Sequence, residues 1–218
     1  MKVGEAGRPV SRFTARWLLL ACVIVSAPCL ANSAHAEEAA RPRGLFIDGT
    51  VSYVRAEDGL AGIEKSTLSV TQMVPAGRVA AGWRFADYVS AEAYGFLLLS
   101  KLGASGTSVM SGQPVEISAL YHAIGVNLVG ILPIGRRWEL AISAGPARLG
   151  ENATVKMSGA TQDIHVGRLG FSAAPSVRFR ASDAIVVHCR FDFFDQFGDE
   201  RVWKGDMAAL GLGVGYTM

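Results

Sequence analysis

Apolar and polar residues alternate with a period of two along most of this chain, and residues 206–218 show the pattern most clearly. Large apolar side chains occupy one parity of this stretch: Leu210, Leu212, Val214, Tyr216 and Met218. The other parity is nearly bare, with Gly211, Gly213 and Gly215. A strand of a water-soluble sheet turns its apolar side chains to a core and polar ones to water, whereas a strand of a membrane barrel turns them to lipid. The pattern favours the membrane barrel.

Eight runs alternate in this way, and after residue 44 no segment has a helical period. The runs are 44–54, 72–85, 88–100, 115–132, 137–150, 164–180, 184–195 and 206–217. Short turns follow the second, fourth and sixth runs, at 86–87, 133–136 and 181–183. Longer polar loops follow the odd runs, at 55–71, 101–114, 151–163 and 196–205. This arrangement predicts an all-β fold, an eight-stranded antiparallel up-and-down transmembrane β-barrel.

Charged residues of the predicted strands share the parity opposite to the large apolar residues. In the seventh run, Cys189 alternates with His188 and Arg190, so Cys189 is expected to face lipid and Arg190 the lumen. The same assignment in every strand predicts a lumen ion-pair network of Asp48, Arg78, Arg84, Glu92, Glu139, Arg168, Arg178, Arg190 and Asp192, with Tyr94, Tyr121, Asn127 and His188 beside it. Eight strands enclose a space just wide enough to be filled by side chains. The near balance of charge therefore predicts a plugged lumen.

Aromatic residues are expected to mark the borders of the membrane. Four of them lie near the short-turn end, Trp83, Phe85, Tyr88 and Trp138. Outer-membrane barrels carry such girdles at both interfaces. Trp203, in the last long loop, is expected to belong to the girdle at the other end.

The first 36 residues have the features of an export signal. Basic residues precede an apolar run at 17–31, and Ala34-His35-Ala36 is a cleavage motif before Glu37. The run is shorter than the roughly 20 residues of a membrane-spanning helix. Lipid attachment at Cys29 is the rival reading, which the preceding Ser-Ala-Pro fits poorly. The expected organisation is a signal peptide at 1–36, a short periplasmic segment at 37–43 and a barrel domain at 44–218.

Composition changes this picture little. The net charge of +2 and the pI near 8.5 come from the leader, which holds four of the 21 basic residues and one of the 19 acidic ones. The near-neutral remainder gives no support to nucleic-acid binding. Removal of the leader leaves Cys189 as the last cysteine, so no disulfide framework is expected.

Three stretches resemble a known family. Residues 81–94 resemble a hairpin of the outer-membrane-protein-A-like eight-stranded barrels, and residues 190–198 and 210–216 resemble the family's last hairpin. The resemblance covers residues 44–218 and implies a place in the outer membrane of a Gram-negative bacterium. It also implies contact with lipid and lipopolysaccharide, and recognition of the C-terminal strand by the outer-membrane assembly machinery. Met218 departs from the aromatic residue that usually ends the family, and no periplasmic domain is implied.

Other functions remain open alternatives. Some small barrels modify lipid, and the barrel deacylases are characterised by a His-x-Ser pattern on one strand. None of His122, His165 and His188 begins such a pattern. The histidine, cysteine and carboxylate residues lack structural-zinc spacing, so neither a metal nor a cofactor is expected. A narrow pore on the same scaffold, or a soluble exported barrel that binds a small apolar ligand, would need the same strands. The sequence favours a structural or surface-interaction role without catalysis, and it does not identify a ligand of the loops.

Overall fold

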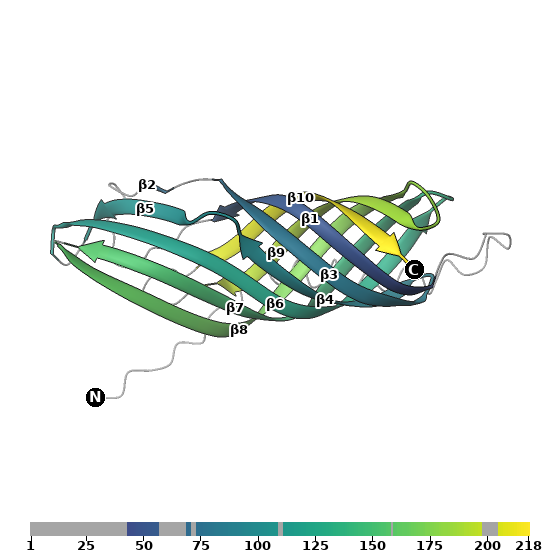
Figure 1. The fold of residues 1–218 in the computed structure, drawn as a ribbon, viewed down its shortest axis with the longest axis horizontal. Coiled ribbons are helices and arrows are strands. Elements are labelled where there is room, and N and C mark those ends of the chain that lie inside the picture. Colours follow the sequence, from purple (N-terminus) through teal and green to yellow (C-terminus); the bar gives the residue numbers. More distant parts are fainter. Residues whose placement is uncertain (1–42, 57–68, 71–72, 109–110, 158, 198–204) are drawn as a thin grey trace, which may run out of the picture. The chain divides into compact units, whose positions relative to one another are not determined.

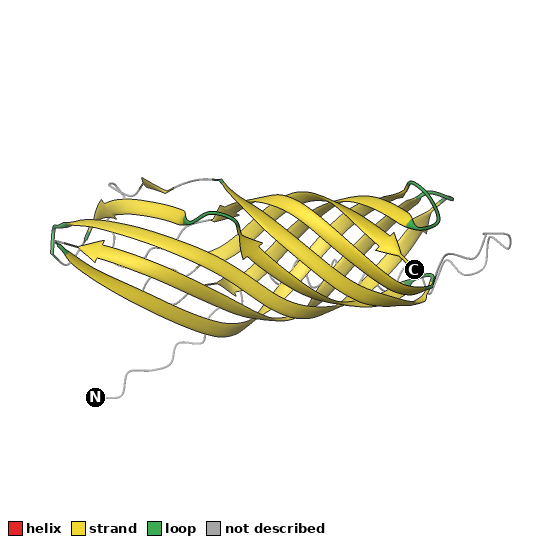
Figure 2. Ribbon diagram, in the orientation of Figure 1, coloured by secondary structure: helices red, strands yellow, loops and turns green. Residues whose placement is uncertain are grey.

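The structure is a computed structural model that describes residues 43–56, 69–70, 73–108, 111–157, 159–197 and 205–218. These residues form strands and short connections (Figures 1 and 2). None of the helices that a membrane span would require occurs in this described part of the chain. The expected signal peptide, its cleavage site and most of segment 37–43 lie outside the described residues, as does Trp203.

The described residues form ten strands. They are β1 (Gly44–Ala56), β2 (Ser69–Val70), β3 (Val74–Ala86), β4 (Val89–Leu98), β5 (Leu102–Thr107), β6 (Pro114–Ile134), β7 (Trp138–Met157), β8 (Ala160–Arg180), β9 (Ile185–Phe197) and β10 (Gly205–Thr217). Eight of them form a closed antiparallel ring in the order β1, β3, β4, β6, β7, β8, β9, β10, which β10 closes by pairing with β1. β5 continues the line of β4 along β6, and β2 pairs with β5. The predicted eight-stranded barrel is confirmed.

Two of the predicted long loops are instead strands, and this corrects the sequence analysis. The interval 101–114 contains β5, and the interval 151–163 contains the ends of β7 and β8. These two strands are joined by a tight turn in which Gly159 has a φ of 82°. Polar side chains such as Asn152, Lys156 and Asp163 lie on the outward face. On the inward face Glu151 and Ala153 are buried and Val155 is half-buried. Polar residues on the outward face argue against a strand only where that face contacts lipid. Where the face contacts water, polar residues are ordinary on the outer side of a sheet. The other two predicted loops fall largely outside the described residues.

The outward face of the ring is apolar, as predicted. Large side chains there are strongly exposed, for example Val79 at 69 %, Leu212 at 69 % and Leu169 at 80 %. On β7 the apolar outward positions run from Trp138 to Pro146, and Arg148 follows them. Eight residue steps on a strand tilted by about 40° rise roughly 21 Å, which is close to the apolar band of about 25 Å of an outer-membrane barrel. Beyond it, β6, β7 and β8 continue past the ring at one end (Figure 1).

Aromatic side chains mark the short-turn border of this band. Trp83, Phe85 and Trp138 are about half-exposed on the outward face. The Trp138 and Phe179 rings are 4.8 Å apart between centroids. This placement agrees with the girdle expected from the sequence.

Candidate functional site: the barrel lumen

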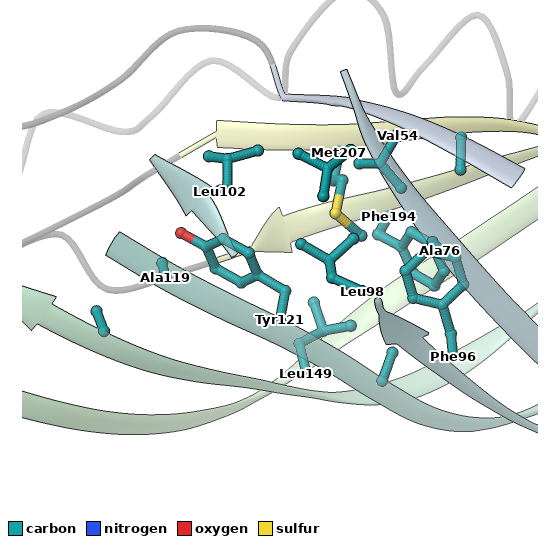
Figure 3. Close-up of a cluster of buried hydrophobic side chains, with 14 of the residues drawn as sticks. Val54, Ala76, Phe96, Leu98, Leu102, Ala119, Tyr121, Leu149, Phe194 and Met207 are labelled. Atoms are coloured by element: carbon teal, nitrogen blue, oxygen red, sulfur yellow. The ribbon is translucent and has the colours of Figure 1, made fainter. Parts of the chain in front are cut away.

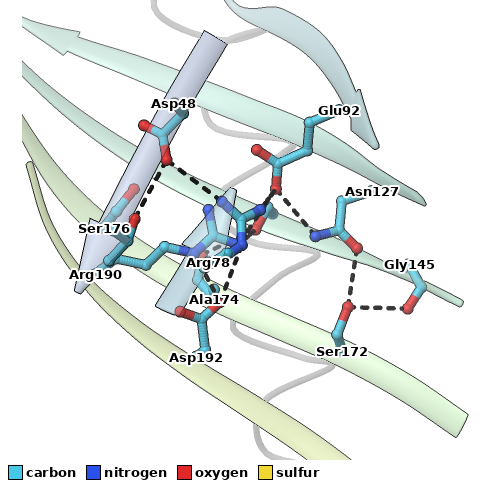
Figure 4. Close-up of polar contacts among 12 residues, drawn as sticks. Asp48, Arg78, Glu92, Asn127, Gly145, Ser172, Ala174, Ser176, Arg190 and Asp192 are labelled. Atoms are coloured by element: carbon cyan, nitrogen blue, oxygen red, sulfur yellow. Dashed lines mark hydrogen bonds and ion pairs between the residues drawn. The ribbon is translucent and has the colours of Figure 1, made fainter. Parts of the chain in front are cut away.

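The centre of the lumen holds an ion-pair cluster built from four strands. Arg78 Nη2 on β3 lies 2.6 Å from Glu92 Oε1 on β4, and Arg190 Nη2 on β9 lies 3.2 Å from the same oxygen. Arg190 Nε also lies 2.7 Å from Asp192 Oδ1, and Arg78 Nη1 lies 3.5 Å from Asp48 Oδ1 on β1 (Figure 4). The Arg78 side chain has no exposed surface. Buried charges of this kind are tolerated only when they are paired and hydrogen-bonded.

Neutral side chains add further hydrogen bonds to this cluster. Asn127 Nδ2 donates to Glu92 Oε1 over 3.1 Å, and the Ser172 hydroxyl donates to Asn127 Oδ1 over 2.9 Å. Arg190 Nη2 donates to the Ser143 hydroxyl over 2.7 Å. The network thereby joins β3, β4, β6, β7, β8 and β9 across the lumen. Such a network is stable as a set, because removal of one member leaves the others buried without a partner.

A second cluster lies near the short turns. Arg84 Nη2 lies 3.2 Å from Glu139 Oε1, and Arg180 Nη2 lies 3.0 Å from that oxygen. Arg84 also donates to the carbonyl oxygen of Asp87 over 2.7 Å. Arg180 was missing from the sequence-based set. It lies two residues after Arg178 on the same face of β8, so strand parity alone could have identified it.

Seven of the nine predicted residues lie in these two clusters. The other two differ from the expectation of a direct ion pair. Arg178 is half-buried and donates from Nε to the Ser176 hydroxyl over 3.3 Å, while its charge lies near Glu92 and Glu139. Arg168 is half-exposed opposite Leu149, beyond the last residue of β8 that pairs with β9. At the level of Arg168 the ring is no longer closed, so a side chain on the inward parity does not lie inside it.

His188 connects a hydroxyl to a carboxylate at the edge of the central cluster. Its Nδ1 lies 3.2 Å from Asp48 Oδ2, and its Nε2 lies 3.1 Å from the hydroxyl of Thr50. A hydroxyl, an imidazole and a carboxylate in this order are the parts of a nucleophilic triad. The sequence analysis missed Thr50, because it searched for a hydroxyl on the strand of the histidine. Gly213 on β10 makes room for the imidazole, since a Cβ there would clash with the ring.

The surroundings of this triad leave little space for a substrate. The Thr50 hydroxyl also lies 3.2 Å from Asp48 Oδ1, and both Thr50 and His188 are buried. The adjoining cavity, lined by Asp48, Glu92, His188 and Arg190 among others, has a volume of about 40 Å³. That volume holds about three water molecules. An acyl chain or a sugar does not fit.

The rest of the lumen, toward the end away from the short turns, is apolar. Phe96 and Phe194 have ring centroids 4.9 Å apart, and the Arg78 guanidinium lies 4.7 Å from the centroid of the Tyr94 ring, between the two zones. Around these rings pack further buried residues, Val54, Val74, Ala76, Leu98, Leu102, Leu149 and Met207 (Figure 3). The sequence analysis predicted a lumen filled by charged side chains with a few neutral polar and aromatic residues beside them, and it did not predict an apolar zone. The sequence did contain evidence for the apolar zone, because these apolar residues share the inward parity.

A buried carboxylate lies within this apolar zone. Glu151 on β7 is 2 % exposed and accepts a hydrogen bond of 3.0 Å from the Tyr121 hydroxyl on β6. Glu151 fell in a predicted loop. Tyr121, in contrast, lies on the inward face as the sequence predicted.

A closed ring of eight antiparallel strands, with an apolar outward face and ion pairs among its inward side chains, is the fold of the small outer-membrane β-barrels. The sequence comparisons add nothing to this, since no family model and no curated protein matches the chain.

Comparison with solved structures leads to the same class. Neisserial surface protein A matches with a TM-score of 0.54 at 11 % identity, over 80 % of this chain and 97 % of its own. Ail, the attachment invasion locus protein of Yersinia pestis, matches with a TM-score of 0.51 at 10 % identity, over 83 % and 100 %. OprG from Pseudomonas aeruginosa matches with a TM-score of 0.51 at 11 % identity, over 84 % and 99 %. At these identities the likeness is one of fold.

Proposed function

We propose that this protein is a closed barrel of the outer membrane of a Gram-negative bacterium, with a structural or surface-interaction role rather than transport or catalysis. One observation carries the proposal: two successive layers of inward side chains lie across the lumen. The Arg78, Glu92 and Arg190 cluster spans the middle of the ring, and the Phe96 and Phe194 layer spans it beyond. An ion would have to displace salt bridges in the first layer and enter an apolar constriction in the second.

The outward face supports a membrane location over a soluble ligand-binding barrel. A soluble barrel of this kind would hold large apolar side chains around an internal cavity. Here Val79 and Leu169 are among the most exposed residues, while charges occupy the interior. The exposed apolar side chains would face lipid, and the end with the short turns would face the periplasm.

The same orientation fixes the partners that we propose. Outward residues of β10, from Leu210 to Tyr216, would contact lipid acyl chains, and lipopolysaccharide would surround the opposite border near Arg148. The strand β10 would also be the segment read by the outer-membrane assembly machinery, with Met218 in the terminal position.

Fractionation combined with heat-modifiability tests the proposal. The folded protein is expected in the outer-membrane fraction, with a gel mobility in detergent that changes on boiling. Recovery of the folded protein from the soluble periplasm would contradict the membrane location, and so would an unchanged mobility.

Hydrolysis is a second candidate function, favoured only by the Thr50, His188 and Asp48 arrangement. Labelling with a fluorophosphonate probe separates the two. We expect no labelling of the folded protein, because the 40 Å³ cavity admits no substrate. Labelling of Thr50 that disappears in His188→Ala would establish a hydrolase.

A further inference from the structure

The outer part of β8 is paired on one side only. β7 pairs with it up to the connecting turn, where Met157 lies opposite Ala160. Pairing with β9 ends earlier, where Phe171 lies opposite Asp195. Within the described ranges of the chain, residues 160–170 therefore have an open second edge. They belong to the part of the sheet that extends past the ring (Figure 1).

The direction of the backbone groups follows from one hydrogen bond. The Arg180 amide donates to the carbonyl of Arg137, on the β7 side, over 2.8 Å. Because the register between β7 and β8 has no shift, even-numbered residues of β8 turn their N–H and C=O groups toward β7. The odd-numbered residues turn theirs to the open side, and nearest the tip these are Thr161, Asp163, His165 and Gly167. An unpaired row of this kind is a template for another strand.

Side chains along this edge are held back against β7. The Thr154 hydroxyl donates to Asp163 Oδ1 over 2.8 Å, and Asn152 Oδ1 lies 2.9 Å from His165 Nδ1. At Gly167 no side chain covers the backbone. Residues 160–170 also contain neither lysine nor proline, which commonly block exposed edges. Within the part of the chain that the structure describes, the backbone of this edge is therefore uncovered as well as unpaired.

We propose that residues 160–170 dock an extended segment of a partner polypeptide, which adds a strand to the open edge of β8. The inference rests on the proposed function, because the tip must face the outside of the cell. An extended polypeptide is the chemistry that matches a ladder of backbone donors and acceptors. The inward side of the edge, with half-buried Ile164 and Val166, requires apolar side chains on one parity of the partner.

Two charges on the edge add a second requirement for the partner. Asp163 faces outward near the tip, and Arg168 faces inward near the ring. An antiparallel partner strand would therefore carry an acidic residue opposite Arg168 and, five positions later, a basic residue opposite Asp163. Opposite-charge pairs across neighbouring strands stabilise a sheet, and like charges destabilise it.

A synthetic peptide with this pattern is the probe. The sequence Thr-Glu-Thr-Val-Thr-Ile-Lys-Val-Thr places its glutamate opposite Arg168 and its lysine opposite Asp163 in antiparallel pairing. The control peptide exchanges the glutamate and the lysine. Fluorescence anisotropy with the full-length protein folded in detergent micelles should show saturable binding of the first peptide and at least tenfold weaker binding of the second. Equal binding of both, or binding of neither, would overturn the proposal.

Two variants at one position separate the edge from the rest of the fold. Gly167→Pro removes one N–H from the open side and none from the bonds to β7, so it should abolish peptide binding while heat-modifiability remains. Gly167→Ala keeps the N–H, and its Cβ would meet only ordinary contacts with Arg148, so binding should persist. Unchanged binding by Gly167→Pro would overturn the proposal. Should Gly167→Pro fail to fold, an N-methylated peptide provides the same test.

Amide hydrogen exchange tests the openness of the edge without any peptide. The amides of Asp163, His165 and Gly167 should exchange fast in the free protein, while those of Ile164 and Val166 are protected by β7. Added peptide should slow the first group. Protection of the first group in the free protein would mean that the chain covers its own edge. If the barrel folds and inserts into the membrane but fails these tests, only the proposed docking edge is wrong. If the barrel does not insert, the proposed function itself is wrong.

Discussion

Replacement of Glu92 by glutamine tests the central cluster, because this carboxylate has three partners. Arg78, Arg190 and Asn127 all contact its Oε1, at 2.6, 3.2 and 3.1 Å, and its side chain is 2 % exposed. Glu92→Gln keeps the shape but removes the charge, so two buried guanidinium groups lose a shared partner. Breaking a buried pair costs about 3–5 kcal/mol.

That cost corresponds to a loss of about 6–20 °C in Tm, since 1 kcal/mol shifts the Tm of a domain of this size by about 2–4 °C. Thermal unfolding in detergent, followed by circular dichroism and by the gel-mobility shift, measures it. Glu116→Gln is the matched control, because Glu116 pairs with Lys156 over 3.6 Å at a solvent-exposed site where a salt bridge contributes little. Equal Tm values for the two variants would refute the claim that the lumen charges act as a buried network.

Three further predictions concern packing on either side of the barrel wall. Cys189 is exposed on the outward face, so in reconstituted protein it should resist a membrane-impermeant thiol reagent, and rapid labelling would contradict this facing. Cys189→Arg should lower the free energy of unfolding by about 2–4 kcal/mol, whereas Cys189→Ala should leave it nearly unchanged. Phe194→Ala should lower unfolding stability by about 3–5 kcal/mol in urea titrations, because Phe194 is fully buried in the apolar layer, and an unchanged midpoint would contradict that layer. Gly213→Ala should destabilise the barrel by about 1–3 kcal/mol, because the added Cβ would clash with the His188 ring. Gly49→Ala is the control, since its Cβ would meet nothing within 4 Å, and equal thermal stability of the two variants would refute the clash.

Strand parity predicted the fold and most of the lumen, because a closed barrel ties the face of a side chain to its sequence position. It placed Cys189 outside and Arg190 inside, and it identified the ion-pair partners Arg78 and Glu92 without knowledge of their distances. Which inward residues meet depends on the stagger of the strands, and the sequence does not state this stagger. For the same reason Thr50 on β1 was not associated with His188 on β9.

The position of the membrane border was the second missing quantity. Polar residues of the interval 151–163 indicated a loop only under the assumption that strands end at the border. In the structure β7 and β8 continue beyond the end of the closed ring, so Glu151 is a buried strand residue and Arg168 lies outside the closed part of the ring. Both errors have this single cause.

Planar-bilayer recording tests the central claim most directly, since that claim is a closed lumen. Protein whose folding has been verified by its mobility shift should produce no steady current at any voltage that the bilayer withstands, because in the proposed closed barrel the salt-bridge layer and the Phe96 and Phe194 layer would both obstruct the ring. A steady, ion-selective current from the wild-type protein would contradict the account, and Arg78 and Arg190 would then line a channel.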